Sequence, residues 1–130
     1  MMKKIFLLIA VVTFSLTSNS QTLAELLQQK KEGYKITGTV SGLKDSTVML
    51  AYYFGGKQYA TDTANVVKGK FIFEGDKKLK GGMYLVVLSE SRYFDIIVSE
   101  QYFSFTTKSD DLVGAMTFKN SKENPAFYEY

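Results

Sequence analysis

The carboxylate of Asp62 is the acidic side chain in this sequence that is best placed to do chemistry. It lies in the segment TDTANV, residues 61–66, which the residue pattern predicts to be a strand. An acid is disfavoured there unless it finds a partner. General acid–base catalysis by a carboxylate pair would need a second acid at a fixed spacing, and no such partner stands nearby in the sequence. We therefore interpret Asp62 as a structural residue that accepts hydrogen bonds from neighbouring hydroxyls or turn amides.

Other charged and glycine-rich stretches are better explained as turns. Asp110 and Asp111 are adjacent, so on a strand they would point to opposite faces, and the triplet SDD is ordinary turn chemistry. Three lysines within residues 77–80 have acidic residues and glycines beside them, as in a solvated loop. The glycine pairs at 55–56 and 81–82 lack the lysine–hydroxyl pair and the strand-to-helix setting of a phosphate-binding loop.

Cysteine and histidine are both absent from the 130 residues. Without a thiol the chain can have no disulfide, no thiolate nucleophile and no cysteine-based metal site. Without histidine it lacks the commonest general base and metal ligand. We therefore predict no catalytic residues, no metal site and no cofactor, and we expect that the protein is not an enzyme.

The tyrosines are the remaining candidates for a functional surface. The sequence has 9 Tyr and 10 Phe, and several of them stand next to one another in predicted strands. Adjacent residues on a strand face opposite sides, so these rings cannot all enter one core. We predict that Tyr53, Tyr59, Tyr93 and Tyr102 contribute to an exposed interaction surface. Cross-strand packing on a two-sided sheet is the alternative.

The N-terminus has the composition of an export signal. Two lysines precede an apolar run from Ile5 to Leu16, and a polar stretch containing Ser18 and Ser20 follows. The apolar run is shorter than the roughly 20 residues that a membrane-spanning helix needs. We predict a cleaved signal peptide at residues 1–20, a location in the periplasm or cell envelope, and no stable membrane span after cleavage.

The charge of the chain argues against nucleic acid as a partner. The 16 Lys and Arg against 13 Asp and Glu give +3, but Lys3 and Lys4 lie in the predicted signal, which leaves 14 against 13, or +1. The remaining lysines are spread along the chain rather than clustered. We therefore expect neither a nucleic acid nor an anionic membrane surface as partner.

Alternation of apolar and polar residues predicts that the rest of the chain is mostly β-structure. KITGTV and GKFIFEG have a period of two, whereas MYLVVLS is apolar on both faces, which is typical of a central strand. Glycine pairs and short polar breaks separate about eight such segments, and no helical segment is long enough for a crossover. We predict an all-β domain at residues 33–119, an antiparallel sandwich or small barrel. A leader or short helix precedes it at residues 21–32.

The final stretch, NSKENPAFYEY, has the residue types of a helix start. Asn120 and Glu123 have the spacing of a capping box, and the Asn-Pro pair that follows offers a second cap. An isolated helix needs roughly 12 to 15 residues to be even marginally stable, so this one must dock or continue. We predict that residues 120–130 begin a connector helix, with Phe127 and Tyr130 as candidates to pack on the β domain.

Several segments in this order resemble a known family. KITGTVSGLKDSTVMLAYY, TDTANV, GKFIFEG, GGMYLVVL and FKNSKENPAFYEY are similar to the β-rich domain of unknown function found N-terminal to thioredoxin-like domains. Those domains occur in envelope thiol-disulfide oxidoreductases of Gram-negative bacteria. The resemblance covers about residues 33 to 130.

In such proteins a helical connection and a thioredoxin fold with a Cys-x-x-Cys pair follow the β domain. The resemblance transfers no active-site residue, because this chain has no Cys. It implies a non-catalytic accessory or interaction domain, whose partner is a thioredoxin-like domain in cis or another envelope protein. The alternative function is a free-standing envelope module that binds a glycan or peptide through exposed tyrosines.

Overall fold

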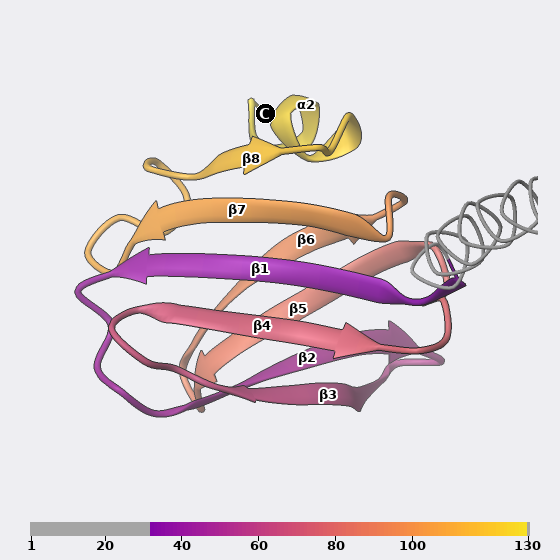
Figure 1. Cartoon of the computed structure of the whole chain (residues 1–130), viewed down its shortest axis with the longest axis horizontal. Helices are drawn as coiled ribbons and strands as arrows, with labels where there is room; N and C mark the ends of the chain where they lie inside the picture. The colour runs from indigo at the N-terminus through magenta and orange to yellow at the C-terminus, as the bar shows by residue number, and fades with distance from the viewer. Residues whose placement is uncertain (1–31, 130) are drawn as a thin grey trace, which may run out of the picture. The chain divides into compact units, whose positions relative to one another are not determined.

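The computed structural model describes residues 32–129, and from Gly33 onward these form a β domain (Figure 1). The predicted signal peptide and residues 21–31 of the predicted leader lie outside the described residues. Eight strands and one short helix make up the domain. They are β1 (Tyr34–Ser41), β2 (Thr47–Phe54), β3 (Lys57–Asn65), β4 (Lys70–Gly75), β5 (Gly82–Ser89), β6 (Arg92–Val98), β7 (Tyr102–Lys108), β8 (Thr117–Lys119) and α2 (Glu123–Tyr128).

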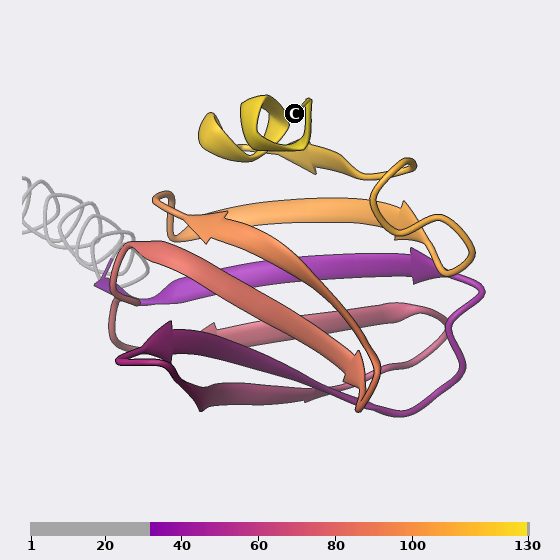
Figure 2. The same cartoon turned by 180° about the vertical axis from the view of Figure 1, so that it is seen from behind.

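The strands form two four-stranded sheets that face each other. One sheet has the order β4-β1-β7-β8, and the other has the order β3-β2-β5-β6. In Figure 1 the first sheet lies nearer the viewer. Figure 2 shows the domain from the opposite side, with the second sheet in front. All neighbouring strands run antiparallel except β1 and β7, which are parallel. Each sheet has two free ends in its strand order, so the predicted sandwich is correct and the barrel is not.

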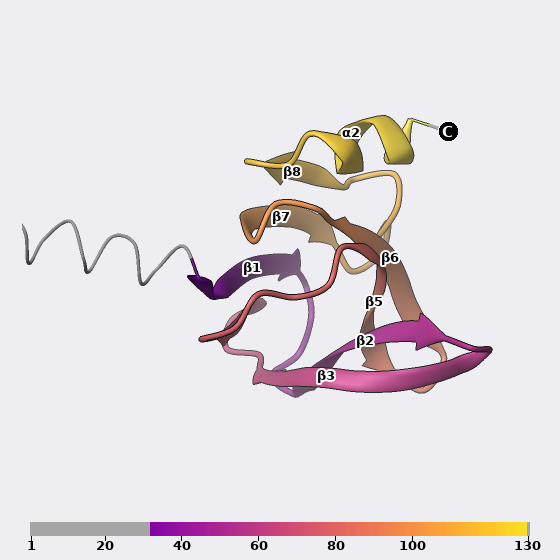
Figure 3. The same ribbon diagram turned by 90° about the vertical axis from the view of Figure 1, so that its right-hand side faces the viewer.

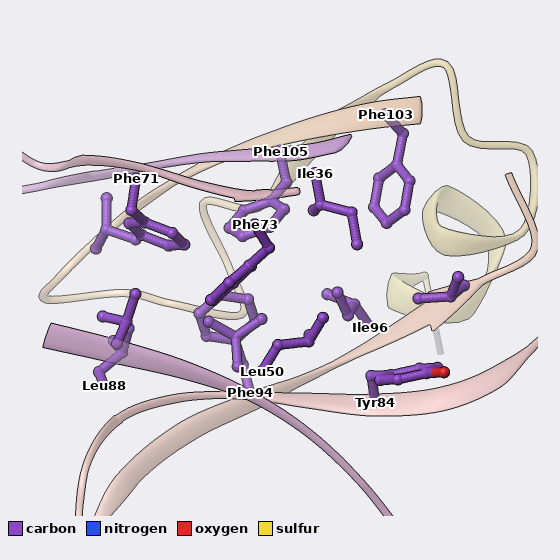
Figure 4. Packing of buried hydrophobic residues seen from close by; sticks show 14 of the residues in the cluster. Ile36, Leu50, Phe71, Phe73, Tyr84, Leu88, Phe94, Ile96, Phe103 and Phe105 are labelled. Atoms are coloured by element: carbon purple, nitrogen blue, oxygen red, sulfur yellow. The ribbon is translucent and has the colours of Figure 1, made fainter. Parts of the chain in front are cut away.

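The core lies between the sheets, on the faces that the alternation predicts. In β1 every second residue, beginning with Tyr34, is buried, and in β4 both phenylalanines are buried. Burying apolar surface stabilises the fold by about 25 cal/mol per Å². Figure 4 shows side chains of the two sheets meeting in this core. The largest buried apolar side chains in it include Phe73 and Phe105 from one sheet and Leu50, Phe94 and Ile96 from the other.

Phenylalanine rings fill the middle of the core and leave no room beside Gly38. The ring of Phe105 lies 5.9 Å from that of Phe71 and 5.3 Å from that of Phe94, in edge-to-face arrangements. A Cβ atom on Gly38 would lie 2.5 Å from the ring of Phe71 and 2.7 Å from that of Phe105. Glycine at this position of β1 therefore allows the two rings to approach the strand.

The hairpin between β2 and β3 turns where the glycine pair predicts. Gly55 and Gly56 have φ of 61° and 79°, as a two-residue type I′ turn requires. Phe54 has the same alternation as the buried Val48 and Leu50, but its side chain is 69% exposed. Figure 3 shows the hairpin tip projecting past the rest of the sandwich, where there is no opposite sheet to pack against.

The end of the chain also departs from the sequence pattern. The last strand of the predicted β domain, β8, has only three residues. Before it, the carboxylate of Asp111 accepts a hydrogen bond from the N–H of Gly114 at 3.1 Å, as in a turn. The capping box is absent, because Asn120 has a φ of 62° and the residue that precedes α2, Lys122, makes no side-chain cap. Within residues 32–129 no helix has the length and apolarity to cross a membrane.

Candidate interaction surface

In the sheet β3-β2-β5-β6, the strands β2, β5 and β6 carry an apolar face that points away from the core. Alternation places the residues between the core positions on this side. The pairing of β2 with β5 and of β5 with β6 arranges them in three rows across the sheet. We define the outer face by nine residues: Met49, Val87 and Tyr93 in the first row, Ala51, Leu85 and Asp95 in the second, and Tyr53, Met83 and Ile97 in the third. In the third row Met83 pairs with Ile97, and Tyr53 follows Tyr52, which is the last residue of β2 to pair with β5.

Large side chains at the margin of the outer face surround a buried centre. Ala51 and Leu85 are buried, although they do not belong to the core between the sheets. Tyr53, Met83 and Tyr93 are 55%, 42% and 56% exposed. Exposed apolar side chains gathered on one face, rather than scattered singly, are typical of an interaction site.

The four tyrosines predicted as interaction residues are all exposed, but the fold distributes them over three surfaces. Tyr53 and Tyr93 lie on the outer face, in its two end rows. Tyr59 lies opposite Tyr52, on the inner side of the projecting hairpin, and the two rings are 5.7 Å apart. Tyr102 lies on β7, on the outer side of the other sheet. The fold thus brings two of the four onto one surface and separates the other two.

The methionines of the outer face were missed by the sequence reasoning. Met49 and Met83 alternate with core residues on β2 and β5. Because β5 is apolar on both sides, it resembles a strand that is covered on both faces. One signal in the sequence could have identified them. β2 and β5 carry apolar residues on both sides, yet no predicted segment was available to cover the side that faces away from the core. Only the strand order shows that both methionines reach the same surface.

Asp62 connects the two sheets at the side where β3 and β4 meet. Its carboxylate accepts hydrogen bonds from the hydroxyl of Tyr34 at 2.8 Å, from the N–H of Glu74 at 3.1 Å and from the N–H of Thr63 at 2.8 Å. Tyr34 and Glu74 belong to the first sheet, whereas Asp62 belongs to the second. Burial and the hydrogen bond to Asp62 raise the pKa of the Tyr34 hydroxyl. These three hydrogen bonds give the Asp62 carboxylate partners and a structural role in joining the two sheets.

An open pocket of about 670 Å³ lies at the end of the sandwich where β1 and β7 finish and β6 begins. Arg92 donates hydrogen bonds to the hydroxyl of Ser109 at 3.1 Å and to its carbonyl oxygen. The guanidinium therefore joins β6 to the loop after β7. Cationic and anionic side chains share this pocket, so the lining does not favour one charge of ligand strongly. The lining residues are Ser41, Gly42, Arg92, Lys108, Ser109 and Asp110.

Helix α2 docks against β6, an edge strand of its sheet. Asn124 is fully buried, and its Oδ1 accepts a hydrogen bond from the N–H of Ile97 at 2.7 Å. Its Nδ2 donates to the carbonyl oxygen of Ile97 at 2.7 Å and to the hydroxyl of Ser121 at 2.9 Å. The hydroxyl of Tyr128 donates to the carbonyl oxygen of Asp95. The side chains of α2 thereby occupy backbone groups of β6 that a further strand would use.

The contacts of α2 differ from those that the sequence predicts. Phe127 is 37% exposed, and Tyr130 lies outside the described residues. Tyr128 forms the aromatic contact instead, with its ring 5.2 Å from that of Phe118 on β8. Asn124, predicted as a possible cap, lies inside the helix with its side chain directed at β6. Among the described residues, no three Asp or Glu side chains come together as a metal site.

Comparison with known families adds one match. A family model described as a domain of unknown function (DUF4369) matches residues 34–127. No curated protein and no solved structure matches the chain. The matched range begins with the first residue of β1 and ends one residue before the end of α2. The docked helix is therefore part of the same family domain as the sandwich.

Proposed function

The chain belongs to the family described as a domain of unknown function (DUF4369), and we propose that it is an exported, non-catalytic accessory and interaction domain. Its partner is a thioredoxin-like thiol-disulfide oxidoreductase, in cis or as another envelope protein. Because this chain has no Cys, the proposal assigns the redox chemistry to that partner. The predicted signal peptide and the resemblance to domains that precede thioredoxin folds support the proposal.

The docking of α2 is the observation that carries this function. A helix of six residues is too short to be stable by itself, and here the contacts of Asn124 and Tyr128 with β6 hold it. A segment that follows α2 would therefore leave the domain from a defined position. An accessory domain that orients a second domain needs such an exit, because a flexible linker would leave the orientation free.

The competing function is a free-standing module that binds a glycan or peptide through exposed tyrosines. The four predicted tyrosines lie on three surfaces, so they do not build one common platform. Among residues 32–129, the one close ring pair that includes a predicted tyrosine, Tyr52 and Tyr59, is tilted by 31° rather than arranged as a flat platform. These observations favour the accessory domain.

The direct test is the coding sequence beyond Tyr130. We expect it to continue into a thioredoxin pattern with a Cys-x-x-Cys segment. If it stops at once, a separate envelope thioredoxin-like protein from the same genome must bind the purified chain, and the proposal fails if none does.

Export is tested separately by cell fractionation and intact-mass measurement. We expect the protein in the periplasmic or envelope fraction, with a mass that lacks about the first 20 residues. Full-length protein in the cytoplasmic fraction would contradict the proposed location.

A glycan array separates the two functions. Binding that disappears in both Tyr53→Ala and Tyr93→Ala, but persists in Tyr102→Ala, would favour the glycan module. The accessory domain predicts no glycan binding that depends on these rings.

A further inference from the structure

We propose that the outer face is the docking surface for a domain joined in cis to the C-terminal end of α2. This inference rests on the proposed function, because it takes the second domain from there. It adds the surface that the second domain contacts and the chemistry that this domain must present.

The side chains of the outer face indicate the chemistry of the partner. Eight of the nine residues are Ala, Val, Leu, Ile, Met or Tyr, and Asp95 is the single charged member. A matching surface is apolar and places one Lys or Arg opposite this carboxylate, because a charge covered without a partner is costly. The outer face of a second copy contains no Lys or Arg, so it does not offer that match.

The size of the outer face also disfavours association between free copies. Three strands about 4.8 Å apart and three rows about 7 Å apart cover a footprint of about 300 Å². A stable complex between separate proteins buries roughly 800 Å² on each partner. A tethered domain needs much less, because a short connection gives an effective concentration in the millimolar range.

The position of α2 places the tether beside this surface. The helix binds the backbone of Asp95 and Ile97 through Tyr128 and Asn124. The side chains of Asp95 and Ile97 belong to the outer face, on its β6 border. A domain that follows Tyr128 closely therefore begins next to the outer face. Close tethering, an apolar surface and a small footprint together favour docking in cis.

Methionine methyl NMR provides the test. The sequence has 5 Met, and removal of the predicted signal leaves Met49, Met83 and Met116. We would compare the protein encoded by the whole reading frame with the chain that ends at Tyr130, and measure relaxation of the methyl signals by a paramagnetic agent in solution. We expect the Met49 and Met83 signals to be relaxed several-fold less in the longer protein. Met116, which packs against the core, is the internal control and should be unchanged.

Matched variants of the longer protein identify the contact. Tyr93→Ser should restore the relaxation of the Met49 methyl to its value in the short chain. Tyr102→Ser, which removes an exposed ring from the other sheet, should leave the methyl signals of Met49 and Met83 protected. Circular dichroism of each variant shows whether the fold is retained.

The outcomes separate this inference from the proposed function. A thioredoxin-like domain that leaves the methyl signals of Met49 and Met83 unprotected overturns the inference and leaves the proposed function standing. Protection by a following domain of another kind supports the inference and contradicts the proposed function. A reading frame that ends at Tyr130, or protection of the short chain that rises with its concentration, overturns docking in cis.

Discussion

The side-chain amide of Asn124 binds the backbone of Ile97 as a neighbouring strand would. It accepts a hydrogen bond from the Ile97 N–H and donates one to the Ile97 carbonyl oxygen, both at 2.7 Å. β6 is the last strand of its sheet, and the unpaired backbone of such an edge invites another strand to pair with it. Asn124 satisfies the backbone groups of Ile97 at this edge without adding a strand. Helix α2 is therefore packed as part of the domain, and the family match to residues 34–127 also includes most of it.

Replacing Asn124 should destabilise the domain strongly. In Asn124→Leu the N–H and C=O of Ile97 lose their partner in a buried position, and we expect the free energy of unfolding to fall by about 2 to 4 kcal/mol. Urea denaturation followed by circular dichroism measures the change. Glu123→Ala alters an exposed residue of the same helix and is the control. Equal unfolding midpoints for the two variants would show that the Asn124 contact is unimportant.

The hydrogen bond between Tyr34 and Asp62 should stabilise the pairing of the two sheets. Tyr34→Phe keeps the ring and removes only the hydroxyl that donates to the carboxylate. We expect a loss of about 1 to 3 kcal/mol in the free energy of unfolding, because the acceptor is charged. Tyr59→Phe makes the same chemical change on an exposed ring and should alter stability by less than about 0.5 kcal/mol. A loss of similar size in both variants would contradict this role.

Stability should decrease at alkaline pH. Burial raises the pKa of Tyr34 and of Tyr128, and nearby carboxylates, Asp62 and Asp95 respectively, raise both further. Above the ordinary tyrosine pKa of about 10 the unfolded chain releases these protons while the folded chain retains them. The unfolded state then binds fewer protons, so the free energy of unfolding falls as pH rises from about 10 toward the raised folded-state values.

Urea midpoints at several pH values between 8 and 11.5 measure this dependence. The double variant Tyr34→Phe/Tyr128→Phe is less stable at pH 8 but should lose less stability above pH 10 than the parent chain. An identical slope in the two proteins would assign the alkaline loss to other groups.

Gly38 should not tolerate a side chain. The added Cβ in Gly38→Ala would lie 2.5 Å from the ring of Phe71 and 2.7 Å from the ring of Phe105, so the rings must move. Overpacking of this kind costs about 1 to 3 kcal/mol of stability. Thermal unfolding should show a lower midpoint than Gly81→Ala, whose nearest contact is 3.4 Å away. A midpoint equal to that of the parent chain would mean that the core rearranges freely.

Much of the fold follows from short-range patterns. β1 and β4 alternate as predicted, β5 is an interior strand with residues buried on both sides, and Gly55 and Gly56 form the predicted turn. The same patterns fail where an element lacks its opposite layer. Phe54 has the correct spacing for the core, but its part of the hairpin projects beyond the other sheet.

The candidate surface was only partly predictable. Adjacent aromatics correctly indicate that Tyr53 and Tyr93 are exposed, but not that Tyr59 and Tyr102 lie elsewhere. Met83 carried no signal of its own, because an apolar residue on an apolar strand is expected to be covered. Asn124 had the residue type of a helix cap, and the same amide chemistry serves equally well to bind the backbone of an edge strand.

By itself, the sequence determined which segments are strands, where most of them turn and which side of each is apolar. These properties depend on neighbours within a few residues, because the strand period is two and a turn involves four residues. Only the tertiary structure decided that β1 runs parallel to β7, that Tyr34 binds Asp62 and that Asn124 binds Ile97. The two hydrogen-bonded pairs are 28 and 27 residues apart. Contacts over such separations arise only when segments far apart in the sequence pack together, and no local pattern specifies them.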